Sequence, residues 1–365
     1  MIEQLPYATT PKYNFPNAVQ DLQLPQNFIE LSLKSMKNLN LEQFHPIETN
    51  LFNSITENTD LTEPTLLNYS PPTLRSIPLK PLPQPTTITA IDVSNIKLGE
   101  TETGILTAIR AAIVWRQSRQ YRYLRLGPFP FHITEQNRRE IYCLFRQYYF
   151  QTPPKDMVGP NLLNMQNRIS NLLERWLQMS ISTSSHDNII LWDGSLTAGT
   201  PDNPTKVLSQ LLEIARNRLN TVLAFTKTTT LRLGGHRLTD LTTKTPPPRL
   251  IQINHYPLHS STPIRFLGNI YIAKLTNGGC SFRLDIDKNI PSEQGIAATQ
   301  KLLGNDLLLQ GYPETLRLAH IYSTFTANEV IGIQRFIAQT YGLKIVTRPN
   351  LRRLLFGPYG KGPEA

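Results

Sequence analysis

Two aspartates follow short apolar segments that are typical of buried strands, Asp92 in ITAIDVS and Asp193 in IILWDGS. A single Asp after a strand usually begins a turn or caps a helix, but neighbouring strands would bring this pair to one edge of a sheet. Glu174 stands 19 residues before Asp193 on an amphipathic helix, from which its carboxylate can lean over the strand ends. An ion pair with Arg168 or Arg175 is the alternative for Glu174.

Three carboxylates in one place repel one another unless a divalent cation lies between them. Oxygen ligands favour Mg²⁺ and Mn²⁺, and two such ions about 4 Å apart activate water and stabilise the leaving oxygen of an in-line displacement. Asp92, Glu174 and Asp193 therefore predict a metal site that cleaves phosphodiesters.

Basic and aromatic side chains suit a nucleic-acid substrate. Lys227 follows the apolar segment TVLAF as Asp193 follows NIILW, so we expect it at the same sheet edge, bound to the scissile phosphate, unless it is an ordinary surface lysine. Residues 110–146 contain eight arginines and only two acids, with aromatic residues between them. Phosphates pair with arginine and bases stack on aromatic rings. The predicted DNA-binding residues are Arg116, Arg119, Tyr121, Arg122, Tyr123 and Arg125. The alternative is a solvated basic face with the aromatic rings in the core.

The charge of the chain is unevenly distributed. The 365 residues are 39% hydrophobic, enough for a buried core, and they carry 37 Lys and Arg against 27 Asp and Glu, a formal charge of +10. Residues 1–85 hold 12 of the 29 prolines and have 5 basic against 8 acidic residues, whereas residues 86–365 have 32 against 19. The positive charge belongs to the second part, and it indicates an acidic macromolecular partner.

The same change in composition predicts three parts. They are an N-terminal proline-rich arm with a helical extension at 1–85, a compact domain at 86–350 and a C-terminal tail at 351–365. In the domain, strand-like and helical segments alternate, which indicates an α/β fold with a mixed sheet flanked by helices. Residues 102–117 have helical or mixed spacing, and a hairpin is predicted for residues 264–286, with its turn at 277–279.

Composition also argues against other classes of protein. No apolar run approaches the roughly 20 residues that cross a bilayer, and the first residues lack the basic and apolar regions of a secretory signal. We therefore expect a cytoplasmic protein without a membrane partner. Cys143 and Cys280 stand 137 positions apart, which excludes a cysteine zinc cluster and a disulfide framework.

Six short segments, in order, resemble the motifs of the NurA family of DNA end-processing nucleases, which have an RNase H-like core. They are AIDVS at 90–94, Glu174 in NLLERWL, ILWDGSL at 190–196, LAFTKTTTLRL at 223–233, the hairpin segments within 270–287 and GYPETLRLAH at 311–320. The first family motif usually reads Asp-Gly-Ser, and Val93 replaces the glycine. The resemblance covers roughly residues 86–345.

This resemblance implies an enzyme with one or two Mn²⁺ or Mg²⁺ ions, a 5′ to 3′ exonuclease and single-strand endonuclease that processes DNA ends in double-strand-break repair. It further implies a homodimer that works with a HerA-type hexameric ATPase. By the same resemblance, Asp92, Glu174 and Asp193 hold metal, His320 is a metal ligand or proton-transfer group, and Tyr312 and Lys227 orient phosphate or water.

Two other functions are compatible with the residues. One is a non-catalytic DNA-binding or HerA-regulating module that retains the fold. The other is an actin-like ATPase, which also begins with a strand and an aspartate. The segment AGTPDNP after Asp193 has one glycine and two prolines, and so lacks the second glycine-rich phosphate loop that an ATPase of this type needs.

Overall fold

The computed structural model describes residues 26–47, 74–150, 159–200, 202–229, 231–233, 236–240, 246–253 and 264–346. Its central feature is an 11-stranded sheet. The strands of this sheet are β1 (Gln43–Pro46), β2 (Leu74–Pro78), β3 (Ile88–Thr101), β4 (Gly104–Gln117), β5 (Gln120–Thr134), β6 (Ile189–Asp193), β8 (Thr221–Thr226), β11 (Arg249–Ile253), β13 (Gly268–Lys274), β14 (Phe282–Asp287) and β17 (Lys344–Ile345).

Strand directions in the sheet are mixed. β3, β4 and β5 form an antiparallel meander, β6 runs parallel to β3, and β8 runs parallel to β6. β14 and β13 continue the sheet as an antiparallel hairpin, followed by β11 and the edge strand β2. The predicted hairpin and the predicted mixed α/β sheet are confirmed. A three-strand meander followed by two parallel strands, each reached through a helical segment, is consistent with an RNase H-like core.

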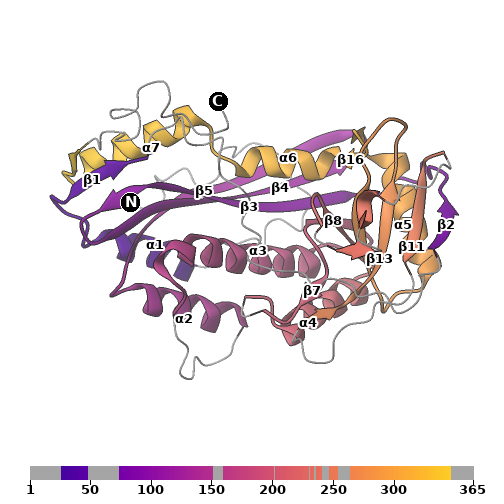
Figure 1. The fold of residues 1–365 in the computed structure, drawn as a ribbon, viewed down its shortest axis with the longest axis horizontal. Helices are drawn as coiled ribbons and strands as arrows, with labels where there is room; N and C mark the ends of the chain where they lie inside the picture. The colour runs from indigo at the N-terminus through magenta and orange to yellow at the C-terminus, as the bar shows by residue number, and fades with distance from the viewer. Residues whose placement is uncertain are drawn as a thin grey trace.

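Helices cover both faces of the sheet (Figure 1). Among the described residues they are α1 (Gln26–Met36), α2 (Arg138–Phe150), α3 (Met165–Ser184), α4 (Thr205–Asn217), α5 (Ser292–Asn305), α6 (Glu314–Ser323) and α7 (Ala327–Thr340). The first four pack on one face in a cluster that includes Ile91 and Trp192. On the other face, α5 and α6 pack over Ala90 and Leu191, and α7 packs over Leu98.

One edge of β3 is paired with two different strands. β4 follows the other edge over nearly the whole length of β3. On the edge away from β4, Ile88–Ile91 pair with β6, and Gly99–Thr101 pair with β1. Between these two pairings, the edge of β3 from Asp92 to Leu98 faces no strand among the described residues. The sheet is therefore open beside Asp92.

The structure corrects the expectation that Asp92 ends its strand. Asp193 is the last residue of β6, but β3 continues past Asp92 to Thr101. No turn occurs at Val93, so the backbone freedom of the family's glycine is not needed there, and a β-branched residue suits an extended strand.

The helical interpretation of residues 102–117 is wrong, because Gly104–Gln117 form β4, the middle strand of the meander. Twelve consecutive residues of this strand, Ile105–Arg116, are buried. A strand that is covered on both faces has no polar side to alternate with its apolar side, so it reads as a continuous apolar run.

Parts of the predicted N-terminal arm belong to the same sheet. β1 pairs with β3 and β17, β2 pairs with β11, and Phe28 of α1 packs against Phe129 and Phe131 of β5. The rest of the arm and the predicted tail at 351–365 lie outside the described residues, and the domain boundary after residue 85 stays a prediction. None of the helices that the structure describes is long and apolar enough to cross a membrane.

Candidate metal centre

Strand register brings the two predicted aspartates together. Ile91 of β3 pairs with Trp192 of β6, so Asp92 and Asp193 are the next residues on neighbouring parallel strands. Successive side chains on a strand point to opposite faces. Ala90 and Leu191 pack under α5 and α6, and Asp92 and Asp193, two residues further along, face the same side.

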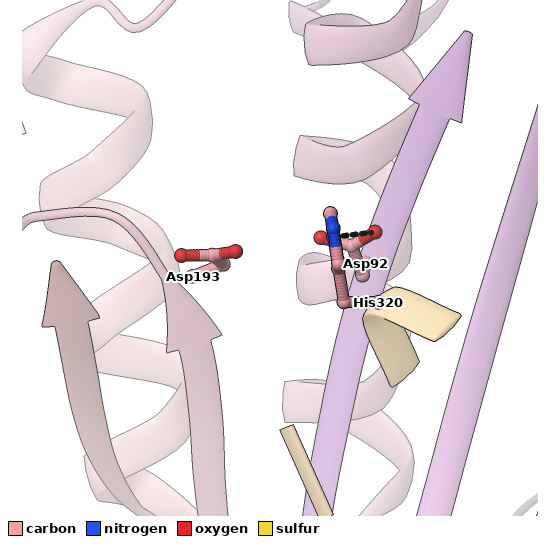
Figure 2. Close-up of side chains that lie close together, drawn as sticks. All are labelled: Asp92, Asp193 and His320. Carbon is pink, nitrogen blue, oxygen red and sulfur yellow. Dashed lines mark ion pairs between the residues drawn. The ribbon is translucent and has the colours of Figure 1, made fainter. Parts of the chain in front are cut away.

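The third member of the cluster comes from α6, which lies over β3 and β4. One ligand atom each from Asp92, Asp193 and His320 lies within 4.8 Å of the others. Figure 2 shows Asp193 at the end of its strand, directed toward Asp92 and His320 across the opening in the sheet. Two carboxylates and one imidazole at this separation are a ligand set that can hold a divalent cation, because carboxylates and imidazoles both bind divalent metals.

The ring of His320 fits such a role. Its Nδ1 lies 3.4 Å from Oδ2 of Asp92, within ion-pair distance, yet Nδ1 has no hydrogen-bond partner among the described residues. Asp92 raises the pKa of His320 against the opposing effect of burial.

Asp92 is 7% exposed and is surrounded by donors and positive charge. Burial alone raises the pKa of this carboxyl, but His320, the hydroxyl of Ser323 and the charge of Lys227 together bring it below its ordinary value. Asp92 is therefore the member of the cluster that is most readily ionised and ready to accept a cation.

The sequence predicts Lys227 and Asp193 at the same sheet edge, and in the structure the two side chains are in contact. Its Nζ lies 2.7 Å from Oδ2 of Asp193 and 5.8 Å from the ring centre of Tyr312. Burial raises the pKa of Asp193, and Lys227 only partly offsets this effect. Tyr312 is buried at the start of β16 (Tyr312–Pro313), where its ring packs against Phe225 and Phe282. The structure thus brings the predicted Lys227 next to Asp193, with the ring of Tyr312 beside Lys227.

Glu174 approaches from the opposite face of the sheet. It lies on α3, it interacts electrostatically with both Asp92 and Asp193, and its Oε1 accepts a hydrogen bond of 2.8 Å from Gln178. The opening beside β3 lets charges on the two faces act on one another. Burial raises the pKa of Glu174 to about 8, and the two aspartates add to this effect against Arg175. Glu174 is outside the group of three ligand atoms, and its role as a fourth ligand stays a prediction.

A buried ion pair that the sequence did not single out holds the loop after Asp193. Arg283 and Asp285 on β14 are both fully buried, and Nε of Arg283 lies 2.7 Å from Oδ1 of Asp285. Oδ2 of Asp285 accepts a hydrogen bond of 3.0 Å from the backbone of Leu196, and Arg283 contacts the hydroxyl of Thr197. The alternation of apolar and polar residues in CSFRLDI predicts a strand, but it does not indicate that Arg283 and Asp285 are buried.

The predicted DNA-binding residues lie along β4 and β5. Arg116 and Tyr121 both contact the buried Asp306, and Arg125 pairs with Glu329. Tyr123 stacks on Tyr322 of α6 with 4.1 Å between ring centres. Arg119 is exposed in the turn between the two strands, and Arg122 is half-buried. Their contact with DNA stays a prediction, and the structure shows which of them also stabilise the fold.

The chain is similar in structure to known nucleases. The NurA nuclease from Sulfolobus solfataricus aligns with a TM-score of 0.46 and 16% identity over 72% of this chain and 86% of that chain. Endonuclease V from Streptomyces avermitilis aligns at 0.33 and 13% over 67% and 82%, and endonuclease V from Bacillus subtilis at 0.31 and 11% over 88% and 95%. No protein-family model matches the sequence, and no curated protein matches it. Since these three TM-scores are below 0.5, the chemistry has to follow from the side chains themselves.

Proposed function

We propose that this protein is a divalent-metal-dependent DNA nuclease whose centre is formed by Asp92, Asp193 and His320, with Glu174 as a further ligand. One observation carries the proposal. Oxygen and nitrogen ligand atoms from three separate elements, β3, β6 and α6, meet within 4.8 Å.

An ion held by these residues supplies Lewis-acid chemistry, since it lowers the pKa of water and neutralises charge on a phosphodiester. Mn²⁺ fits the donor set better than Mg²⁺, because one donor is an imidazole. The cluster also lies at the C-terminal end of α6, where the helix dipole favours a cation.

The other residues have roles in binding and proton transfer. Lys227 pairs with a non-bridging oxygen of the scissile phosphate once Asp193 is engaged with the ion, because an ammonium is a point charge suited to phosphate. Tyr312, beside Lys227, orients the phosphate or the attacking water. His320 either binds the ion or moves a proton, and its position against Asp92 serves both roles.

The wider biological role is part of the same proposal. We expect a 5′ to 3′ exonuclease and single-strand endonuclease that works on DNA ends in double-strand-break repair. It would act in the cytoplasm as a homodimer with a HerA-type ATPase. The net positive charge of residues 86–365 supports a polyanionic substrate.

The direct test is cleavage of 5′-labelled single- and double-stranded DNA by the full chain with Mn²⁺. Asp193→Asn keeps the shape of the side chain and removes a ligand charge, so it should lower the rate by about 100-fold or more. Asp187→Asn is the matched control, because Asp187 is exposed and its positive φ of 52° suits asparagine. Equal cleavage by Asp193→Asn and wild type would contradict the proposal.

One observation favours a non-catalytic DNA-binding module as the second candidate. The charges in the cluster already balance internally, because Asp92 pairs with His320 and Asp193 pairs with Lys227. A protein that keeps the fold without catalysis would bind DNA normally and show no Mn²⁺-stimulated cleavage.

A further inference from the structure

Two serine hydroxyls converge on the carboxylate of Asp92. Ser323, the last residue of α6, donates a hydrogen bond to Oδ2 of Asp92 across 231 positions of sequence. The hydroxyl of Ser94 lies 2.8 Å from that of Ser323 and 3.3 Å from the same Oδ2. Ser323 is fully buried, so this contact takes place away from bulk water.

Each hydroxyl has one proton, and the surrounding acceptors decide where the two protons go. The backbone oxygen of His320 lies 2.9 Å from the Ser323 hydroxyl, but it already accepts a hydrogen bond of 3.1 Å from the backbone of Thr324. The carboxylate of Asp92 carries a charge and is the stronger acceptor of the two, so the Ser323 proton goes to Asp92. The shorter of the two Ser94 contacts is with Ser323, so Ser94 donates to Ser323. The result is a two-step chain, from Ser94 to Ser323 to Asp92.

This chain selects one oxygen of the carboxylate. Ser94, Ser323 and His320 all contact Oδ2, and no described residue makes a polar contact with Oδ1. When donors bind one oxygen of a carboxylate, they fix the plane of the carboxylate group. The second oxygen then remains available for a cation.

The segment after Ser323 is held in place from the sheet. Arg110 of β4, the cross-strand partner of Ser94, donates a hydrogen bond of 3.0 Å to the backbone oxygen of Thr324 and lies 4.2 Å from the ring centre of Phe325. It also pairs with Glu329 of α7 at 3.0 Å. The end of α6, and with it the Ser323 hydroxyl, is therefore fixed relative to β3.

We propose that Ser323, supported by Ser94, is a positioning residue for the metal centre, which holds Asp92 in the orientation that presents Oδ1 to a divalent cation. The inference rests on the proposed metal-dependent function. Hydrogen bonds to ligands from outside the ligand set usually change metal affinity by about 10- to 100-fold.

The experiment measures Mn²⁺ binding by the full chain without DNA, through the electron paramagnetic resonance signal of free Mn²⁺. We expect Ser323→Ala to weaken binding by about 10- to 100-fold, Ser94→Ala to weaken it less, and Ser323→Thr, which keeps the hydroxyl, to bind more tightly than Ser323→Ala. Because Ser94 acts through Ser323, the double variant should bind no more weakly than Ser323→Ala alone.

Ser35→Ala is the matched control, since Ser35 is also a buried helical serine with a hydrogen bond to a backbone oxygen, but lies on α1. It should bind Mn²⁺ as wild type does. Equal Mn²⁺ affinity in wild type and Ser323→Ala, with binding lost in Asp193→Asn, would overturn this inference and leave the proposed function standing. Failure of wild type to bind Mn²⁺ at all would overturn both. If Ser323→Ala does not fold, an unchanged affinity in Ser94→Ala would overturn the inference.

Discussion

Glu174 allows a test that separates the electrostatics of the cluster from its activity. The folded protein holds the carboxyl proton up to a pKa of about 8, whereas the ordinary value is 4.5. Between these two values the folded state binds a proton that the unfolded chain has released, so the free energy of unfolding falls as pH rises. The loss is about 1.4 kcal/mol per pH unit.

The shift corresponds to an upper limit of about 5 kcal/mol for the whole window. Glu174→Gln keeps the shape and the hydrogen-bonding capacity but removes the titration. Without metal, the variant should therefore unfold at about the same temperature as wild type at pH 5 and at a higher temperature at pH 8. A stabilisation of a few kcal/mol corresponds to roughly 4–6 °C in a protein of this size.

The assay is thermal unfolding in EDTA at pH 5 and pH 8, followed by the same scans with saturating Mn²⁺. Glu213→Gln, at an exposed position of α4, is the control for removal of a surface charge. Mn²⁺ should stabilise wild type more than Glu174→Gln, because the ion supplies the positive charge that the carboxylate lacks. If Glu174→Gln is no more stable than wild type at pH 8 in EDTA, the carboxylate is already satisfied by its neighbours and this reasoning is wrong.

Three further variants test other parts of the structure. Lys227→Met removes the ion-pair partner of Asp193 and should lower DNA cleavage while Mn²⁺ binding persists; loss of Mn²⁺ binding would show that the lysine is structural. Arg283→Met leaves Asp285 buried without its cation and should lower the free energy of urea unfolding by about 3–5 kcal/mol; a loss below about 1 kcal/mol would contradict the importance of this pair for the loop. Although burial opposes it, hydrogen bonds from Arg110 and the Thr326 backbone lower the pKa of Glu329 from 4.5 to about 2. Its stabilisation is present above pH 4.5 and disappears as pH falls toward 2, so wild type should lose more stability than Glu329→Gln between pH 5 and pH 3. Because Glu329 is about a third exposed, solvent screening reduces the difference to about 1–2 kcal/mol.

Several elements were predictable because their signals are local. The segments IILW and TVLAF are short, β-rich and bounded by polar residues, and they form the neighbouring parallel strands β6 and β8. The glycines at 278 and 279 indicated the turn of the hairpin formed by β13 and β14. The proximity of Asp92 and Asp193 followed from placing the strands that contain ITAI and IILW side by side.

Other features depend on burial from both faces or on distant partners. The strand β4 reads as a possible helix because helices on both sides remove any alternation between polar and apolar residues. The opening beside β3, which lies next to Asp92 at mid-strand, arises because β1 and β6 share one edge of that strand. Neither arrangement has a local sequence signal.

The chain by itself specified the chemical groups of the site: two aspartates after apolar segments, a helical glutamate, and a lysine in the position equivalent to Asp193. The tertiary structure decided how these groups are used. It placed Glu174 on the opposite face and Ser323 on Oδ2 of Asp92, and it buried Arg283 with Asp285. The physical reason is that periodicity records the burial of each residue, whereas a hydrogen bond or an ion pair between distant residues depends on how whole elements pack.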